Sequence, residues 1–216
     1  MGRGVVESAL RAGAGAPGLK LIETCGWDGA GFGARLPLHL ARLMQSAQAL
    51  GWACDLGAVQ AALDASVVPG RAMRVRLTLD QAGMLEVIVA DLPAAQASWR
   101  VGLAPARLMS SNPWLAIKST RRDEYDTARA HLPPGVDEVV FQNERGEVCD
   151  GTITNVFFDR GQGMRTPPLS AGLLPGVLRA ELAVREEVLL ASDLPVVQLW
   201  VGNSLRGLIP ALWVDI

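Results

Sequence analysis

The chain has 216 residues, half of them hydrophobic, with a net charge of −2 and a pI of about 5.7. This near-neutral balance gives no electrostatic case for nucleic acid or an anionic membrane as a partner, and no apolar run is long enough to span a bilayer. Three scattered cysteines argue against a disulfide framework, and two histidines argue against a His-rich metal site. We therefore expect a soluble cytoplasmic protein without a metal, built as one large domain or two small ones.

The N-terminal half alternates strand and helix signals. Residues 1–18 are rich in Gly and Ala and are expected to be flexible; Pro17 and the strand that follows argue against reading their GxGxxG match as a dinucleotide site. Periodicity predicts strands at 19–27, 74–80, 84–92 and 99–104, and helices at 37–51 and 55–65. A connector at 105–113 divides the chain into a smaller domain, 1–106, and a larger one, 107–216.

A predicted hairpin is the centre of the second half. Its two strands and turn are 138–142, 148–158 and 143–146. Asp150-Gly151 interrupts the second strand, which suggests a bulge or a close backbone approach. With Thr152, Thr154 and Asn155, this acid could orient a small polar molecule. A surface hairpin whose polar residues face water is the plainer interpretation of this stretch alone.

Lys118 directly follows an apolar run. A buried lysine loses hydration, so its pKa falls and its amine can attack a carbonyl to form a Schiff base. A lysine at a strand end can instead extend its ammonium group to water. Shortly after it, Thr120 and Asp123 have the spacing of a capping box, which predicts a helix to about residue 131.

Two later segments could bind an anion. The segment 173–179 leads into a predicted helix that ends near residue 190, and Pro-Gly before the helix leaves free backbone N–H groups that can form an anion cradle. A small polar loop at 202–204 joins predicted strands at 196–201 and 209–214, and its backbone could serve the same purpose. An ordinary helix start and an ordinary turn explain both patterns as well.

Taken in order, several motifs resemble those of the class IV aminotransferases. These fold-type IV pyridoxal-phosphate enzymes include branched-chain and D-amino-acid aminotransferases and 4-amino-4-deoxychorismate lyase. The motifs are HLARL at 39–43, NPWLAIK at 112–118, NERGEVCDGTITNVFF at 143–158, PPL at 167–169, LPGVLR at 174–179 and VGNS at 201–204. The resemblance runs from about residue 21 to 211. It implies an α+β protein with a small N-terminal α/β domain, a larger barrel-like C-terminal domain, and a homodimeric assembly.

The resemblance also implies roles for individual residues. Lys118 corresponds to the lysine that holds pyridoxal 5'-phosphate as a Schiff base, and Arg42 to the arginine that binds the phosphate. The backbone of Val177 and Leu178 corresponds to the phosphate cradle, and Ser204 lies in the second phosphate loop. A dianionic phosphate needs such a guanidinium together with oriented N–H groups.

The hairpin supplies the remaining cofactor contacts that the resemblance implies. Thr152, Thr154 and Asn155 correspond to residues along the ring and phosphate. Asp150 stands where the family has a glutamate that bonds the pyridine nitrogen, so that the ring can act as an electron sink. Aspartate carries the same charge on a shorter side chain. Leu178 is a second departure, because the family often has threonine there.

Within the family, the sequence most resembles 4-amino-4-deoxychorismate lyase, in the motif at 112–118 and in NSLRGLIPA at 203–211. That enzyme releases pyruvate and 4-aminobenzoate, a folate precursor, from a small-molecule amine with two carboxylates. Arg107 and Arg206 are candidates to bind those carboxylates, and Thr24 aligns with a threonine on the cofactor-facing first strand. The alternatives are an aminotransferase of branched-chain or D-amino acids, and a cofactor-binding paralogue with little or no catalysis.

Overall fold

The structure is a computed structural model that describes residues 3–216. The chain divides into two compact units, and the segment around residue 118 belongs to the first of them. Unit 1 is Met1–Ala94 with Ile117–Arg121, and unit 2 is Ala95–Ala116 with Arg122–Ile216. The expected boundary after residue 106 falls inside strand β4 (Trp99–Leu108), which is one continuous strand of unit 2.

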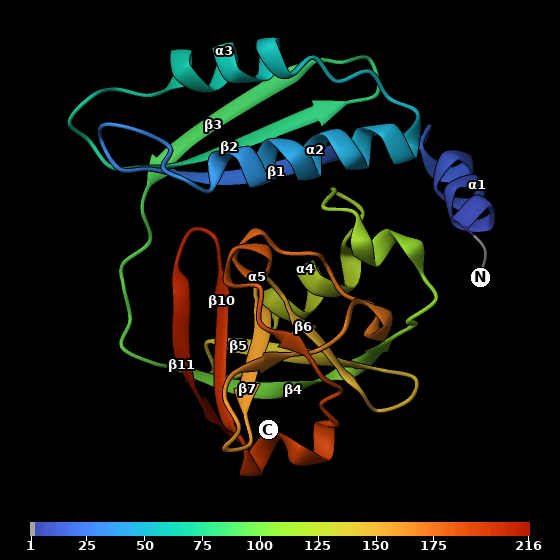
Figure 1. Cartoon of the computed structure of the whole chain (residues 1–216), viewed down its shortest axis with the longest axis vertical. Coiled ribbons are helices and arrows are strands. Elements are labelled where there is room, and N and C mark those ends of the chain that lie inside the picture. The colour runs from blue at the N-terminus through green and yellow to red at the C-terminus, as the bar shows by residue number, and fades with distance from the viewer. Residues whose placement is uncertain (1–2) are drawn as a thin grey trace. The chain divides into compact units, whose positions relative to one another are not determined.

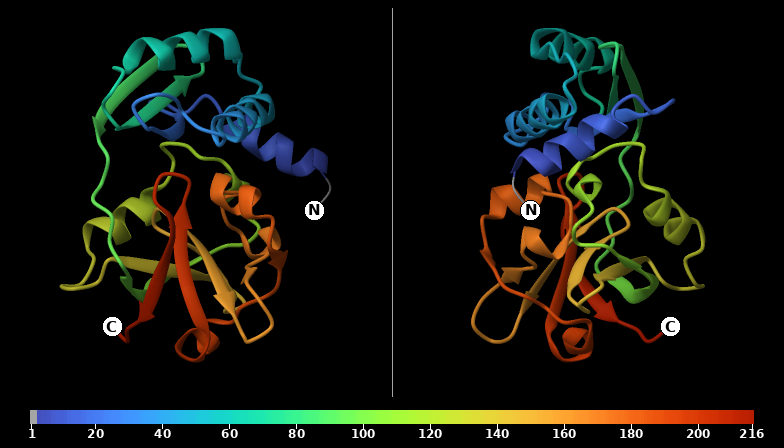
Figure 2. Two further views of the ribbon diagram at one scale, coloured as in Figure 1. Left: turned by 60° about the vertical axis from the view of Figure 1, so that its left-hand side comes forward. Right: turned by 90° about the vertical axis from the view of Figure 1, so that its right-hand side faces the viewer.

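Unit 1 is a three-stranded antiparallel sheet with helices packed against it (Figure 1). The strand order is β1-β2-β3; α2 lies along β1 in Figure 1, and α3 lies beside β2 and β3 in Figure 2. The elements are α1 (Arg3–Gly13), β1 (Lys20–Trp27), α2 (Leu36–Leu50), α3 (Leu56–Ser66), β2 (Met73–Asp80) and β3 (Leu85–Asp91). The strands and the helices α2 and α3 agree with the sequence prediction to within one or two residues.

The core of unit 1 follows from the two periodicities of its sequence. On β2, Val75 and Leu77 are buried while the intervening Arg76 is only half-buried, as alternation across a strand requires. On α2, Leu43 and Ala47 are buried on the predicted apolar stripe.

Local caps fix the ends of these helices. α2 ends at Gly51, whose φ of 73° is left-handed and is tolerated because glycine has no Cβ. α3 begins at Asp55, whose carboxylate accepts hydrogen bonds from the backbone N–H groups of Gly57 and Ala58. Within the leader expected to be flexible, residues 3–13 form the helix α1, on which Leu10 is buried.

Unit 2 is a barrel. Its sheet runs β10-β11-β4-β5-β6-β7-β8-β9, and a further pairing of β7 with β10 closes the first six strands on themselves (Figure 1). Two buried apolar clusters pack against the strands. The elements after β4 are η1 (Pro113–Ala116), α4 (Asp123–Ala130), β5 (Glu138–Asn143), β6 (Val148–Gly151), β7 (Asn155–Asp159), β8 (Arg165–Thr166), η2 (Leu169–Ala171), α5 (Val177–Leu182), β9 (Arg185–Glu186), η3 (Ala191–Val196), β10 (Gln198–Asn203) and β11 (Gly207–Trp213).

Two predictions for unit 2 need correction. The strand expected at 148–158 is two strands, because the chain leaves the ladder after Gly151 and re-enters it at Asn155. The helix expected to continue to about residue 190 ends at Leu182, because Ala183 adopts a left-handed conformation with φ of 48°. The residues that follow pair with β8 as β9 instead of continuing the helix. None of the helices in residues 3–216 is long and apolar enough to cross a membrane.

Candidate active site

Lys118 lies in an extended segment that runs alongside β1. Its carbonyl accepts a hydrogen bond from the backbone N–H of Ile22 at 2.8 Å, and Ser119 forms a bridge with Leu21. Thr120 continues the pairing: its hydroxyl accepts from the N–H of Lys20 and donates to the carbonyl of Gly18. The capping-box prediction is therefore wrong, since these contacts occupy the Thr120 side chain and α4 begins only after Arg122, which offers no side-chain cap.

Arg42, the predicted phosphate ligand, is held by a buried carboxylate. Its Nε and Nη2 donate to the two carboxylate oxygens of Glu23 at 2.9 and 2.6 Å, and His39 Nδ1 lies 2.6 Å from Glu23 Oε2. Burial raises the pKa of Glu23, but the charge of Arg42 and the hydrogen bonds from His39 and Arg42 outweigh it and lower the pKa to about 2. Glu23 is thus ionised, and it fixes the guanidinium in one plane.

The predicted lysine and arginine are both linked to β1 within unit 1, where Lys118 pairs with Ile22 and the Arg42 guanidinium bonds the next residue, Glu23. Burial, followed by the charge of Glu23, raises the pKa of the Cys25 thiol to about 12, while the charges of Arg42 and Lys118 act to lower it. Both cations therefore lie within electrostatic range of one thiol. Thr24 stands between Glu23 and Cys25 on β1, so its side chain faces the opposite side of the sheet.

Asp150 is a buried carboxylate at the end of β6. Its Oδ1 accepts from the Tyr125 hydroxyl and its Oδ2 from the Leu174 N–H, both at 3.0 Å. Burial raises its pKa to about 7, against the lowering effect of these two hydrogen bonds and of Arg122; Glu138 raises it further. Each carboxylate oxygen has a second lone pair, so Asp150 can still accept a ring N–H.

The loop between β6 and β7 is closed by another buried acid, Glu138 on β5. Its two oxygens accept from the hydroxyls of Thr152 and Thr154 at 2.5 and 3.0 Å, and from the N–H groups of Thr152 and Ile153. A hydroxyl has a single hydrogen, so these two threonines can face a ligand only as acceptors or through their backbone. A Cβ on Gly151 would lie 2.4 Å from Thr154 Oγ1, which explains the glycine.

Asn155 connects this loop to the start of α5. Its Nδ2 donates to the carbonyl of Leu174 at 3.0 Å, and a Cβ on Gly176 would lie only 1.8 Å from its Oδ1. Gly176 is the residue before α5 and contributes no side-chain cap to the first amides of the helix. The predicted cradle at Val177 is therefore open to an outside acceptor rather than to a side chain of its own.

Leu178 on α5 and Ser204 after β10 lie on two segments that approach each other at Gly202. Leu178 is buried, and a Cβ on Gly202 would lie 2.8 Å from its Cδ2, so an apolar side chain is packed where the family often has threonine. Gly202 pairs with Asn155 across β10 and β7. Ser204 follows in a half-buried turn. Unit 2 thus brings the predicted loop and the start of α5 together.

The two arginines predicted to bind substrate carboxylates make contacts inside unit 2. Arg107 Nη1 donates to the carbonyl of Asn143 at 3.0 Å, and the Arg206 guanidinium lies 5.1 Å from the ring centroid of Trp99. Neither of these contacts involves Asp150. The assignment of Arg107 and Arg206 to the substrate carboxylates stays a prediction.

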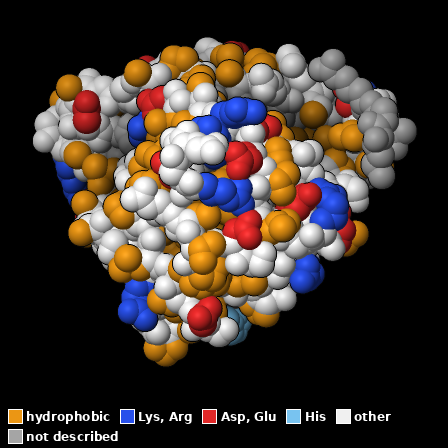
Figure 3. Space-filling view, turned by 60° about the horizontal axis from the view of Figure 1, so that its bottom comes forward, with side chains coloured by type: hydrophobic (Ala, Val, Ile, Leu, Met, Phe, Trp, Pro, Cys, Tyr) orange, Lys and Arg blue, Asp and Glu red, His pale blue; other side chains and the backbone are white. Residues whose placement is uncertain are grey.

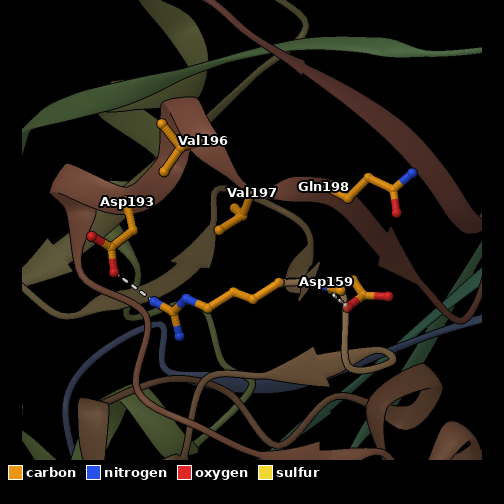
Figure 4. A pocket seen from close by; sticks show the side chains of 7 residues that line it. Asp159, Asp193, Val196, Val197 and Gln198 are labelled. Carbon is orange, nitrogen blue, oxygen red and sulfur yellow. Dashed lines mark hydrogen bonds and ion pairs between the residues drawn. The ribbon is translucent and has the colours of Figure 1, made fainter.

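An open pocket of about 520 Å³ lies elsewhere on unit 2 (Figure 4). Its walls include no predicted site residue, and the ion pair between Arg160 and Asp193 crosses it. The face of unit 2 shown in Figure 3 intersperses charges of both signs among apolar side chains, without a basic stripe. Within residues 3–216 no group of His, Cys, Asp and Glu side chains could hold a metal ion.

Each unit holds residues that fit part of a pyridoxal 5'-phosphate molecule. In unit 1, Lys118 and Arg42, which are linked to the adjacent β1 residues Ile22 and Glu23, match its aldehyde and its phosphate. In unit 2, the buried acid Asp150 has spare acceptor capacity that matches the ring nitrogen, and the uncapped start of α5 matches the phosphate.

Sequence reasoning missed three residues of this site: Glu23, Tyr125 and Glu138. Glu23 and Glu138 do carry a signal, because each is an acid inside a strand whose neighbours are apolar, and a buried acid needs partners. Tyr125 carries only one weak sign, its position as the sole tyrosine of the chain on a mostly polar helix.

Comparisons with known proteins place the chain among the class IV aminotransferases. Residues 20–212 match the family model described as amino-transferase class IV. A Schizosaccharomyces pombe protein provisionally named as an aminodeoxychorismate lyase is 30% identical over 168 residues, which are 75% of this chain and 72% of that protein. The aminodeoxychorismate lyase of Bacillus subtilis is 34% identical over 87 residues, which are 34% of this chain and 28% of that protein. A crystal structure from Mesorhizobium loti, provisionally named as an amino-acid aminotransferase, is 45% identical with a TM-score of 0.82, and the match covers 91% of this chain and all of that one.

Proposed function

Since the chain belongs to the class IV aminotransferase family, we propose that it is the lyase that converts 4-amino-4-deoxychorismate into pyruvate and 4-aminobenzoate with pyridoxal 5'-phosphate. The observation that carries the proposal is the combination of a family match over residues 20–212 with Lys118 and a glutamate-bound Arg42, both linked to adjacent residues of β1. The lyase names of two relatives support the choice of reaction.

Bound pyridoxal phosphate supplies an electron sink that stabilises negative charge on a substrate attached through its amine. The residues of this chain would do the remaining work. Lys118 holds the aldehyde carbon and then carries a proton to and from the substrate. Arg42, oriented by Glu23, and the first amides of α5 bind the phosphate. Asp150 keeps the ring nitrogen protonated.

Other residues have supporting roles in the proposal. The loop that Glu138 closes shapes the wall beside the ring, with Thr152, Thr154 and Asn155. Ser204 contributes to the second phosphate loop. Arg107 and Arg206 are the candidates for the substrate carboxylates, and Thr24 is the candidate for a further catalytic group on β1.

An aminotransferase is the second candidate, because the 45% identical crystal structure carries that name. Both reactions use the same lysine, so the residues described above do not distinguish them. The cofactor's fate does. A lyase returns the cofactor to its starting form in every cycle, whereas an aminotransferase leaves it as pyridoxamine phosphate until a keto acid arrives.

The deciding experiment supplies purified holoprotein with 4-amino-4-deoxychorismate and no keto acid. We expect pyruvate and 4-aminobenzoate over many turnovers, without accumulation of pyridoxamine phosphate. A single turnover with an L- or D-amino acid, restored by 2-oxoglutarate, would assign an aminotransferase. A protein that binds the cofactor but responds to no amine would be non-catalytic, with Asp150 and Leu178 as the residues to examine.

The family resemblance also supports a homodimer in the cytoplasm as part of the proposal. The homodimer is tested by the molar mass of the holoprotein, measured by size-exclusion chromatography with light scattering. A mass near 46 kDa, twice the 22.9 kDa of the chain, is expected.

A further inference from the structure

The carboxylate of Asp150 has a phenol partner that the sequence did not reveal. Tyr125 lies in the first turn of α4, and its hydroxyl donates to Asp150 Oδ1 at 3.0 Å. The ring packs edge-on against Phe141 of β5, with centroids 5.0 Å apart. The hydroxyl is therefore held in place by the packing of its own ring and reaches the acid without strain in the helix.

Arg122, the residue immediately before α4, contacts the loop that follows Asp150. Its Nη2 donates to the carbonyl of Thr152 at 2.7 Å, and its guanidinium lies 5.7 Å from the centroid of the Tyr125 ring. Arg122 and the first turn of α4 therefore contact the end of β6 and the loop after it. The Leu174 N–H donates to the second Asp150 oxygen, so each oxygen of the carboxylate accepts one hydrogen bond.

We propose that Tyr125 is a positioning residue that fixes the Asp150 carboxylate in the orientation needed by the pyridine nitrogen. The proposal rests on the proposed function for the nature of the ring. Aspartate is one carbon shorter than glutamate, so fewer of its side-chain rotamers can bring the carboxylate to the ring nitrogen. A donor fixed by packing selects one of them and favours the ionised form.

The electrostatic surroundings agree with this role. Burial raises the pKa of Asp150 to about 7, and Glu138 on β5 adds to the increase, whereas the Leu174 N–H, Tyr125 and Arg122 oppose it. Burial, followed by the charge and the hydrogen bond of Asp150, raises the pKa of the Tyr125 hydroxyl, so it remains a donor across the physiological range. Burial, followed by the charge of Asp150, raises the pKa of the adjacent Cys149 thiol, so this thiol is uncharged at neutral pH.

The chain offers a direct measurement, because Tyr125 is its only tyrosine. Cofactor-free protein labelled with ¹³C at the tyrosine Cζ gives one resonance, which reports the charge of the hydrogen-bond acceptor. We expect this resonance to titrate near pH 7 together with Asp150, and to become independent of pH in Asp150→Asn. A resonance that does not respond to pH in the wild type, or responds equally in Asp150→Asn, would overturn the contact.

The positioning role has its own test in the active holoenzyme. Tyr125→Phe keeps the ring on Phe141 and removes only the hydroxyl. Because the hydroxyl stabilises the ionised acid, its loss should raise the pKa of Asp150 and move the acid limb of the kcat profile upward by roughly one pH unit. An unmoved limb would refute the role while leaving the proposed function intact. If the wild type turned over no substrate, the proposed function would fail, and the resonance of the cofactor-free protein would still decide the contact.

Discussion

Replacing Glu23 by glutamine tests the network that holds Arg42. Glutamine has nearly the same shape but no charge, so the variant leaves the guanidinium in a buried site with a weaker partner. The pKa of Glu23 falls from 4.5 to about 2 on folding, and at about 1.4 kcal/mol per pH unit this corresponds to roughly 3 kcal/mol of stabilisation at pH 7. We expect Glu23→Gln to lose about that much, and to bind the cofactor more weakly because Arg42 is no longer fixed.

The stabilisation that Glu23 contributes should depend on pH in a defined direction. A lowered folded-state pKa means that the contribution of Glu23 is complete above pH 4.5 and is lost as the pH falls toward 2. The difference in unfolding free energy between wild type and variant, measured by urea denaturation, should therefore narrow as the pH is lowered from about 4.5 toward about 2.

The matched control is Glu86→Gln, which breaks the exposed ion pair of Glu86 with Lys20 in the same unit. That variant should change stability by no more than about 1 kcal/mol. Equal losses in the two variants, or a gap for Glu23→Gln that stays constant with pH, would refute the reasoning.

Three further predictions follow from the site. Borohydride reduction of the holoprotein and peptide mapping should find the pyridoxyl group on Lys118; its recovery on Lys20, the other lysine of the chain, would contradict the assignment. Asp150→Asn should still bind the cofactor but lower kcat roughly 10²-fold, because the substitution removes the charge and keeps the shape. Cofactor affinity and kcat are measured on the same protein, and full turnover would rule out a role for Asp150 at the ring nitrogen. Gly176→Ala should destabilise the protein by about 1–3 kcal/mol in thermal unfolding, because its Cβ collides with Asn155, whereas Gly15→Ala, where nothing lies closer than 4.0 Å, should be almost neutral.

Elements with strong local signals were predictable from the sequence. The alternation of β2 and the stripe of α2 each repeat within a few residues, and Gly51 stops α2 through its own backbone freedom. The failures share a different cause. Thr120 has the spacing of a helix cap, but Gly18 and Lys20, about 100 residues earlier, capture its hydroxyl. A local sequence pattern cannot show that such distant residues compete for the same hydroxyl.

The same distinction applies to the candidate site. Lys118 and Arg42 could be proposed from the sequence because each lies in a motif of consecutive residues. Glu23 escaped because its partners are 16 and 19 residues away on a helix, and Tyr125 because its acceptor is 25 residues away on a strand. A single sequence shows which residues could donate or accept, but the fold decides which of them meet.

Three buried acids illustrate how the fold assigns different tasks to the same chemical group. Glu23 meets a guanidinium and a histidine and is held ionised, whereas Glu138 is satisfied by four donors of one short loop. Asp150 receives only two neutral donors, and its burial raises its pKa to about 7. A carboxylate in that condition gains more from one additional cation than either of the others, because its charge is the least compensated. A protonated ring nitrogen is such a cation, so the acid that the fold leaves least satisfied is the one that the proposed function requires to bind it.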